Sequence, residues 1–209
     1  MPARYALDLD DGDRLRAVEP TRVEIAGAAA RLASFYNDPH NRAMLAHDED
    51  LSARDVVAHY RALAGEGARA FFLELDGRLV GDGDLRNVNR NRAEAAILVG
   101  DRAMQGRGLG TRFGVMLHAF AFGTLRLRRT YASIIPANAG SLRLFEKLGY
   151  RPDASRLARR FADEPSDVTL SLDAERFRQL HGALAARVVV TALSEARARG
   201  ARTTTRRSR

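Results

Sequence analysis

The chain has 209 residues, of which 45% are hydrophobic, and this size predicts one globular domain with a full core and excludes two large domains. No apolar run approaches the roughly 20 residues that a membrane span needs. The N-terminal sequence MPARYALDLDDGDR is acidic where a signal peptide is apolar, so we expect a cytoplasmic protein with no membrane contact. The absence of cysteine excludes disulfides, thiol catalysis and thiolate metal sites.

The net charge of +8 is concentrated near the C-terminus. From Arg187 onward there are seven arginines and one glutamate, which leaves a net charge of +2 on residues 1–186. Because the body of the chain is nearly balanced, we do not expect nucleic-acid binding beyond non-specific contact by the basic tail.

The first half of the chain predicts two helices between a short strand and a hairpin, after an N-terminal segment of residues 1–13. Thr21 can cap the first helix, and Ser52 with Asp55 resembles a capping box for the second. Asp76-Gly77 is a hairpin turn. The predicted elements are a strand at 13–18, helices at 21–36 and 52–66, a hairpin at 68–89 whose second strand runs from 78 to about 87, and a strand at 93–100.

The second half alternates helices and strands. A glycine-rich turn at 106–110 leads into an amphipathic helix that ends near Gly123, and Asn138 and Gly149 predict the two ends of a later helix. The remaining predicted elements are strands at 129–135 and 167–172 and a helix from 173.

The C-terminal helix is expected to continue into the 190s as a helical extension over residues 178–200. Beyond it, residues 201–209 contain arginine, serine and threonine with a single alanine. This composition cannot bury enough apolar surface to order the chain, so it predicts a disordered arginine-rich tail.

The glycine-rich turn predicts a phosphate site. A Walker loop is excluded because the turn ends Gly110-Thr111-Arg112 without the required lysine. A dinucleotide fold is excluded because Thr111 replaces the third glycine and the next strand lacks an acid. Free amides at a helix N-terminus can still hold a pyrophosphate, and glycines let the backbone approach it.

Two motifs in order identify a family resemblance. Gln105-x-x-Gly108-x-Gly110 follows a strand, and NAGSLRLFEKLGYR begins at Asn138. Together they resemble the GNAT superfamily of acetyl-CoA-dependent N-acetyltransferases, over residues 14–177. The segments RAEAAILVG and DVTLSLDAERF resemble most the branch with ribosomal-protein N-terminal and spermidine acetyltransferases. The resemblance implies an α/β (α+β) fold: a single GNAT-like domain with a mixed central β-sheet flanked by helices.

The resemblance also implies acetyl-CoA as the cofactor. Backbone amides in the turn and nearby polar side chains would hold its phosphates, and the central strand would pair with the pantetheine amides. Asn138 corresponds to a cofactor contact and is also a plausible helix N-cap. The implied cofactor-binding residues are Ile97, Leu98, Val99, Gln105, Gly106, Arg107, Gly108, Leu109, Gly110, Thr111, Arg112, Asn138, Ser141 and Phe145.

Catalysis in the family uses a backbone amide of the central strand, here near Leu98, to polarise the thioester carbonyl. Glu94 corresponds to the carboxylate near the amine, with a solvent-facing strand glutamate as the alternative. Phe145 stands where many members carry the tyrosine that protonates the leaving thiolate. The general acid is therefore unassigned, with water, Tyr131 or Tyr150 as alternatives.

The implied function is acetyl transfer to a primary amine of a protein N-terminus, polyamine or aminoglycoside. A non-catalytic acyl-CoA sensor is the alternative, and a homodimer is an expected assembly. The acidic cluster Gly81–Asp84 misses calcium-loop spacing and is interpreted as a turn, although Asp82, Asp84 and Asn87 could face an acceptor cleft. No metal site is expected.

Overall fold

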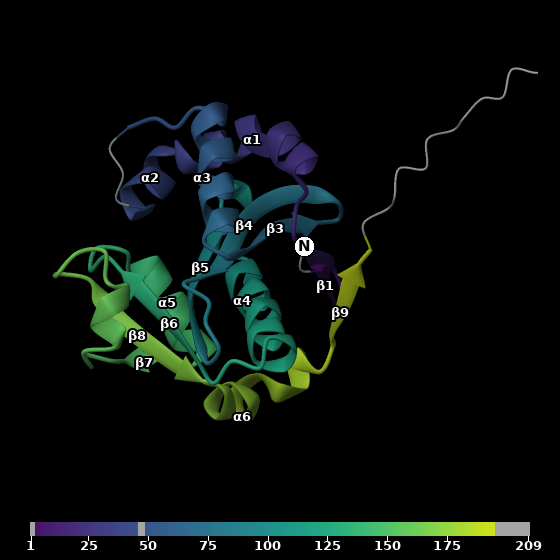
Figure 1. The fold of residues 1–209 in the computed structure, drawn as a ribbon. Helices are drawn as coiled ribbons and strands as arrows, with labels where there is room; N and C mark the ends of the chain where they lie inside the picture. The colour runs from purple at the N-terminus through teal and green to yellow at the C-terminus, as the bar shows by residue number, and fades with distance from the viewer. Residues whose placement is uncertain (1–2, 46–48, 195–209) are drawn as a thin grey trace, which may run out of the picture.

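The computed structural model describes residues 3–45 and 49–194, and its strands form one mixed sheet of nine strands (Figure 1). The spatial order is β7-β8-β6-β5-β4-β3-β2-β1-β9. The strands are β1 (Arg4–Asp10), β2 (Arg14–Val18), β3 (Arg69–Leu75), β4 (Arg78–Arg86), β5 (Arg92–Val99), β6 (Arg129–Ile134), β7 (Arg151–Pro152), β8 (Val168–Asp173) and β9 (Val188–Leu193). The α-helices are α1 (Arg22–Tyr36), α2 (Pro39–Leu45), α3 (Ala53–Gly65), α4 (Leu109–Ala119), α5 (Ala139–Leu148) and α6 (Ala174–Ala185).

The helices cover opposite faces of the central strands (Figure 1). On β4, the Asp82 side chain meets Tyr36 of α1 and Tyr60 of α3. Its neighbour Gly83 faces α4, where an added Cβ would lie 2.8 Å from the ring of Phe113. Because successive strand residues point to opposite faces, β4 is buried between α1 and α3 on one side and α4 on the other.

Each face has its own apolar core. The larger core joins the sheet to α4, α5 and α6, and its fully buried side chains include Phe71, Phe113, Phe120 and Phe177. A smaller core under α1 and α3 contains Phe35 and Phe72. This second core fixes α1 and α3 over β4 and β5, where the candidate site lies.

The helix ends follow the local sequence. Thr21 with Glu24, and Ser52 with Asp55, form complete capping boxes at α1 and α3. The Asn138 side chain accepts a hydrogen bond from the Ser141 amide at the start of α5. These interactions confirm the predicted helix starts.

The predicted helical extension over 178–200 is helical as far as Ala185, is wrong for residues 186–194, and lies outside the described residues from 195 onward. Helix α6 ends at Ala185, and Val188–Leu193 forms β9, which pairs antiparallel with β1. The valine run favours a strand, and β1 lies within the N-terminal segment 1–13, for which we predicted no structure. The sequence did not indicate that β1 would pair with Val188–Leu193, and this pairing is what makes the segment a strand. The predicted arginine-rich tail 201–209 lies outside the described residues.

The interpretation of the acidic sequence Gly81–Asp84 as a turn is wrong, whereas the predicted second hairpin strand, from 78 to about 87, corresponds to β4. It lies within β4 and pairs residue by residue with Ile97–Val99 and Ala96 of β5. The two glycines are required by packing, because a Cβ at Gly81 or Gly83 would lie closer than 3.0 Å to backbone oxygens of β5. The alternating aspartates therefore point together toward α1 and α3.

Candidate active site

The sheet opens at the parallel pair of β5 and β6. These strands pair over only three residues, Arg92–Glu94 with Arg129–Tyr131, whereas β4 stays paired with β5 as far as Val99. In the described part of the chain, Ala95–Val99 is thus paired on the β4 side alone. Such an edge can pair with an extended ligand as an added strand. Ile97 and Val99 lie on this segment, as the sequence predicted.

The glycine-rich turn lies at the open end of β5. Gly106 and Gly108 have positive φ angles of 74° and 79°, and an added Cβ at either would meet nothing within 4 Å. Gly108 is the N-cap of α4 and supplies no side-chain hydrogen bond. The amides of the first helical turn therefore have no side-chain cap and lie at the positive end of the helix dipole. This backbone fits a diphosphate.

Gln105 fixes the turn to the end of β5 and to α2. Its amide nitrogen donates to the Val99 carbonyl at 2.7 Å and to the Asn41 side chain at 2.8 Å. Asn41 is buried and donates in turn to the carbonyls of Phe35 and Gly100. The side-chain amide of Gln105 is thus already hydrogen-bonded within the protein. This arrangement favours a role in holding the shape of the turn over a direct contact with phosphate.

Arg107 of the turn and Arg112 of α4 differ in their surroundings. The Arg112 guanidinium forms ion pairs with Asp11 and Asp13, so its charge is neutralised by the loop between β1 and β2. These ion pairs do not support the phosphate contact expected for Arg112. They connect α4 to the hairpin formed by β1 and β2. Arg107 is exposed beside the turn and keeps its charge available to an anion.

Asn138 and Ser141 lie at the start of α5. The Asn138 oxygen caps the helix, and its Nδ2 donates to the Met44 carbonyl at 2.9 Å. Both polar groups of Asn138 are therefore engaged, and the side chain links α5 to α2 across the opening. Ser141 is half-buried. A Cβ added at Gly110, in the first turn of α4, would lie 3.3 Å from Leu144 of α5 and 3.7 Å from Val99 of β5.

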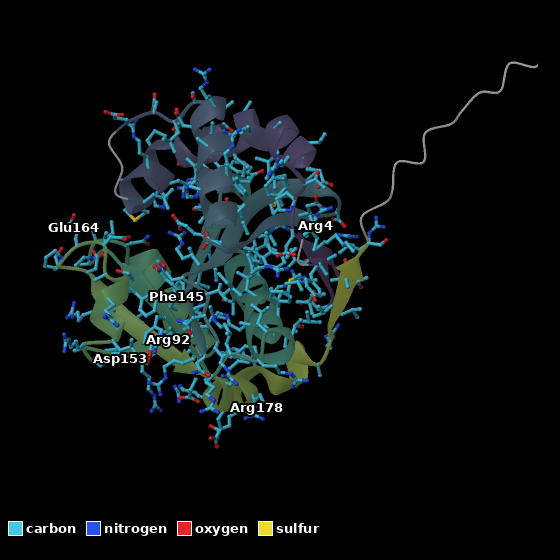
Figure 2. All side chains as sticks on the ribbon, viewed as in Figure 1. Arg4, Arg92, Phe145, Asp153, Glu164 and Arg178 are labelled. Carbon is cyan, nitrogen blue, oxygen red and sulfur yellow. The ribbon has the colours of Figure 1, made fainter. Side chains whose placement is uncertain are left out.

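Phe145 packs inside the fold (Figure 2). Only 3% of its surface is exposed, and its ring meets Tyr150 edge-on at 4.8 Å between centroids. This burial does not support the expected cofactor contact. Tyr150 is buried with its hydroxyl bonded to His118 and Thr130, and Tyr131 stacks on Phe161. Neither tyrosine is exposed to act as a general acid.

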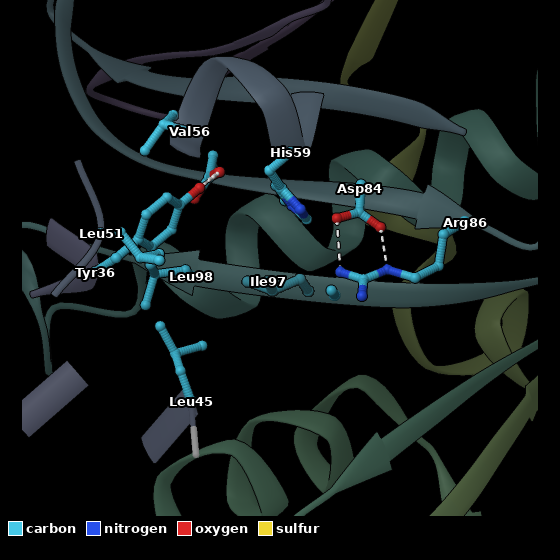
Figure 3. A pocket seen from close by; sticks show the side chains of 12 residues that line it. Tyr36, Leu45, Leu51, Val56, His59, Asp84, Arg86, Ile97 and Leu98 are labelled. Atoms are coloured by element: carbon cyan, nitrogen blue, oxygen red, sulfur yellow. Dashed lines mark hydrogen bonds and ion pairs between the residues drawn. The ribbon is translucent and has the colours of Figure 1, made fainter. Parts of the chain in front are cut away.

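A cavity of about 230 Å³ lies between α1, α3 and the β4–β5 pair (Figure 3). One end is largely apolar, with Leu45, Leu51, Val56 and Leu98 grouped around the Tyr36 ring. The other end holds His59, Asp84 and Arg86. The main-chain segment Ala96–Leu98 lines the floor, so the cavity reaches the strand on which the thioester carbonyl was expected.

Glu94 lies beyond the polar end of this cavity. It is 8% exposed and its carboxylate accepts a hydrogen bond from Asn87 at 2.9 Å. Burial raises the pKa of Glu94 to about 7, although Arg86 and the Asn87 hydrogen bond act in the opposite direction. A carboxyl with this pKa can exchange a proton near neutral pH. Glu94 is thus a buried polar residue, in contrast to the solvent-facing alternative.

The cavity as a whole holds more negative than positive charge. The Arg86 guanidinium donates to both oxygens of Asp84, at 2.7 and 2.8 Å. Glu94 and Asp163 also interact electrostatically with Arg86. The charged residues that line the cavity are the carboxylates Asp82 and Asp84 and the guanidinium of Arg86, and this balance favours a cationic ligand over an anionic one.

Asp82 lies at the apolar end. Its Oδ2 accepts hydrogen bonds from the hydroxyls of Tyr36 and Tyr60, and it is the register partner of Leu98. Burial raises the pKa of Asp82 to about 6, against the two tyrosine hydrogen bonds, which lower it. The sequence placed Asp82 only as one possibility for the cleft; Tyr36 and Tyr60 were missed, because helix periodicity marks both as ordinary core residues.

A sequence profile of the acetyltransferase (GNAT) domain matches residues 15–151. The chain belongs to the GNAT acetyltransferase family. The GNAT chain is also 32% identical over 125 residues to the probable N-acetyltransferase YjcK of Bacillus subtilis (strain 168). That match covers 59% of this chain and 64% of the relative, so the chain matches less than two thirds of that protein's length.

Solved structures agree on the GNAT fold. The fold is similar to Mycobacterium smegmatis RimJ in complex with CoA-disulfide, with a TM-score of 0.66, 21% identity, and coverage of 89% of this chain and 92% of that chain. It is also similar to spermidine N-acetyltransferase from Vibrio cholerae in complex with CoA and spermine, with a TM-score of 0.63, 16% identity, and coverage of 78% and 97%. The predicted family and fold class are confirmed.

Neither a membrane-spanning helix nor a metal-binding cluster is found in the described part of the GNAT chain. None of its helices is long and apolar enough to cross a membrane. Among residues 3–45 and 49–194, no group of three histidine, aspartate or glutamate side chains is arranged to hold a metal ion.

Proposed function

We propose that this GNAT domain transfers the acetyl group of acetyl-CoA to a primary amine. The observation that carries the proposal is that three structural features lie next to one another along β5. The glycine turn lies at the end of β5, and Gly108 caps α4 without a side-chain hydrogen bond. The edge of β5 that does not pair with β6 leads away from this turn. A cavity with buried carboxylates lies against the same strand. In the proposed enzyme, the turn is the anion site, the strand edge binds the pantetheine arm, and the cavity is the amine site.

The amides of Arg107, Gly108, Leu109, Gly110 and Thr111 would hold the diphosphate, and Arg107 would add a positive charge. The backbone of Ile97 and Val99 would pair with the pantetheine arm, and the amide near Leu98 would polarise the thioester carbonyl. When bound, acetyl-CoA supplies the activated acetyl group. The chain's own residues orient it and remove protons from the amine.

Proton removal is the difficult step for an aliphatic amine. With a pKa of about 10.4, such an amine is neutral roughly once in 10³ molecules at pH 7, which corresponds to a deficit of about 4 to 5 kcal/mol. A carboxylate near the amine is the proposed base, and the family resemblance implies Glu94, with its pKa raised to about 7, acting directly or through water.

The acceptor class stays a proposal. The structural relatives include enzymes crystallised with spermine and with the aminoglycoside kanamycin, and the cavity's excess of carboxylates favours a cationic amine. A protein N-terminus, a polyamine and an aminoglycoside-like amine are all consistent with it. A homodimer and a cytoplasmic location likewise stay predictions.

The test is release of free thiol from acetyl-CoA with n-butylamine, spermidine, kanamycin and an unacetylated tripeptide. We expect turnover with at least one of them. If Glu94 is the base, Glu94→Gln lowers kcat/KM most below the amine's pKa and much less at high pH, where free amine is abundant. A loss that is uniform across pH would assign Glu94 to binding or structure.

Phe145 favours a second candidate, a non-catalytic acyl-CoA sensor, because the usual tyrosine is missing and both alternative tyrosines are buried. Tight CoA binding by calorimetry, with no turnover across the amine panel and no effect of Glu94→Gln on CoA binding, would favour the sensor. Water can protonate the thiolate in the enzyme, since CoA is itself a good leaving group.

A further inference from the structure

The carboxylate of Asp82 is buried without a cationic partner. Asp82 is 8% exposed, and no ion pair to it is formed within residues 3–45 and 49–194. The nearest guanidinium on its strand, that of Arg86, is committed to Asp84. A buried carboxylate held by hydroxyl groups alone pays a large desolvation cost, which a bound cation would offset.

The geometry leaves one oxygen of Asp82 for a ligand. Both tyrosine hydroxyls donate to Oδ2, at 2.6 Å from Tyr60 and at a shorter distance from Tyr36. In the described part of the chain no hydrogen bond is made to Oδ1, while Asp82 lines the cavity. Tyr36 and Tyr60 therefore orient the carboxylate and leave Oδ1 as the acceptor that a ligand can reach.

Asp82 is also closer than Glu94 to the expected reaction centre. It is the cross-strand partner of Leu98, and such partners have Cα atoms about 5 Å apart. Glu94 lies four residues from Leu98 on the same strand, which is about 13 Å at the usual rise per residue. Asp82 lines the cavity, and Glu94 is not among the residues that line it.

We propose that Asp82, oriented by Tyr36 and Tyr60, is the carboxylate that binds the acceptor's amino group and takes its first proton. This inference rests on the proposed acetyl transfer and refines the assignment of the base. The apolar end of the cavity, formed by Leu45, Leu51 and Val56, then holds the carbon chain next to that nitrogen.

The proton balance is complete with these groups. The ammonium gives one proton to Oδ1 of Asp82, and the neutral nitrogen attacks the acetyl carbonyl carbon. A C–N bond forms and the C–S bond breaks. The second nitrogen proton goes to the departing thiolate, and Asp82 later releases its proton to solvent through the cavity. The products are an amide, the free thiol and one proton.

The charged and titratable groups around Asp82 agree with this role. From α1 and α3, Tyr36 and Tyr60 have pKa values raised by burial, so they remain hydrogen-bond donors. His59 of α3 has a lowered pKa because of burial and Arg86, so it stays neutral near pH 7. On β4, Asp84 raises the pKa of Asp82 and Arg86 lowers it; from β5 the facing residue is Leu98.

The experiment compares Asp82→Asn, Glu94→Gln and a control, Glu74→Gln. Glu74 is a half-buried carboxylate on β3 that does not line the cavity. Binding of n-butylamine to the CoA-saturated protein is measured by calorimetry at pH 7, and kcat/KM with acetyl-CoA is measured from pH 6 to 10. We expect Asp82→Asn to weaken n-butylamine binding at least tenfold and to lower kcat/KM roughly 10²-fold at pH 7, with recovery at high pH.

A further variant separates catalysis from folding. Tyr60→Phe removes a hydrogen bond that lowers the pKa of Asp82, so the acidic limb of the kcat/KM profile should shift to higher pH. A purely structural role for Tyr60 would lower activity without moving that limb.

The inference is wrong if Asp82→Asn binds n-butylamine as the wild type does, or if wild-type protein binds no amine. It is also wrong if Glu94→Gln alone causes the pH-dependent loss; in that case the proposed acetyl transfer stands with Glu94 as its base. Absence of wild-type turnover with all four amines, despite amine binding at Asp82, would contradict the transferase and leave an amine site.

Discussion

The buried histidine of α4 predicts an acid-sensitive contribution to stability. His118 is fully buried, with Nδ1 at 2.6 Å from the Gly114 carbonyl and Nε2 at 2.7 Å from the Tyr150 hydroxyl. A carbonyl only accepts, so Nδ1 carries the proton of a neutral ring. Burial lowers the pKa of His118 from 6.5 to about 4.

The sign follows from proton binding. Between pH 6.5 and 4 the unfolded chain binds a proton at this histidine that the folded protein does not, so lowering the pH favours unfolding. A solution at pH 5 is about 1.5 pH units below the pKa of this histidine in the unfolded chain. This difference corresponds to a loss of about 2 kcal/mol of unfolding free energy. Asp82 and Glu94, whose pKa values are raised, contribute with the opposite sign.

A comparison with His118→Leu isolates the effect, because Asp82 and Glu94 contribute equally to both proteins. The unfolding free energy is measured by urea denaturation at pH 7.5 and pH 5. The variant loses two hydrogen bonds and is less stable at pH 7.5. We expect this deficit to shrink by about 2 kcal/mol at pH 5, since only the wild type loses the histidine contribution. A deficit that is the same at both pH values would refute the reasoning.

Three other predictions concern the turn, the sheet and the tail. Gly108→Val should raise the KM for acetyl-CoA at least tenfold with the fold retained by circular dichroism, because the side chain enters the open space of the turn; an unchanged KM would place the diphosphate elsewhere. Gly83→Ala should lower the unfolding free energy by about 1 to 3 kcal/mol, because its Cβ would lie 2.5 Å from the Ala96 oxygen. Its control, Gly27→Ala in α1, meets nothing within 4 Å and should not destabilise; equal effects would contradict the packing argument. Deleting residues 201–209 should leave turnover with n-butylamine unchanged and reduce retention on phosphocellulose at low salt, whereas lost turnover would place the tail in an active site.

Local sequence signals predicted most of the fold. The capping residues at Thr21, Ser52 and Asn138 act within three residues of themselves, so the chain alone specifies them. The central strands were predicted from runs of apolar residues and the glycine-rich turn from its composition. Each of these features needs no knowledge of the rest of the molecule.

The errors came from long-range pairing. The strand β9 exists because β1, at the opposite end of the chain, provides its hydrogen-bonding partner. The acids of Gly81–Asp84 resemble a turn in sequence although the predicted hairpin strand contained them, and close packing of the two glycines against β5 agrees with the strand.

The candidate site was predicted in part for the same reason. Motifs located the glycine turn and Glu94, which are local in sequence. Motifs could not show that Asp11 and Asp13 neutralise Arg112, since these residues are about 100 positions away. The grouping of Tyr36, Tyr60 and Asp82 likewise depends on two helices meeting one strand.

The central claim is that acetyl-CoA binds at the glycine turn with its thioester beside Leu98 and Asp82. A crystal structure of the protein with CoA and n-butylamine tests it most directly. The account predicts the diphosphate on the amides of residues 107–111, the pantetheine arm along Ile97 and Val99, and the amine nitrogen within hydrogen-bonding distance of Oδ1 of Asp82. A diphosphate bound elsewhere, or an amine outside the cavity between α3 and β4, would contradict it.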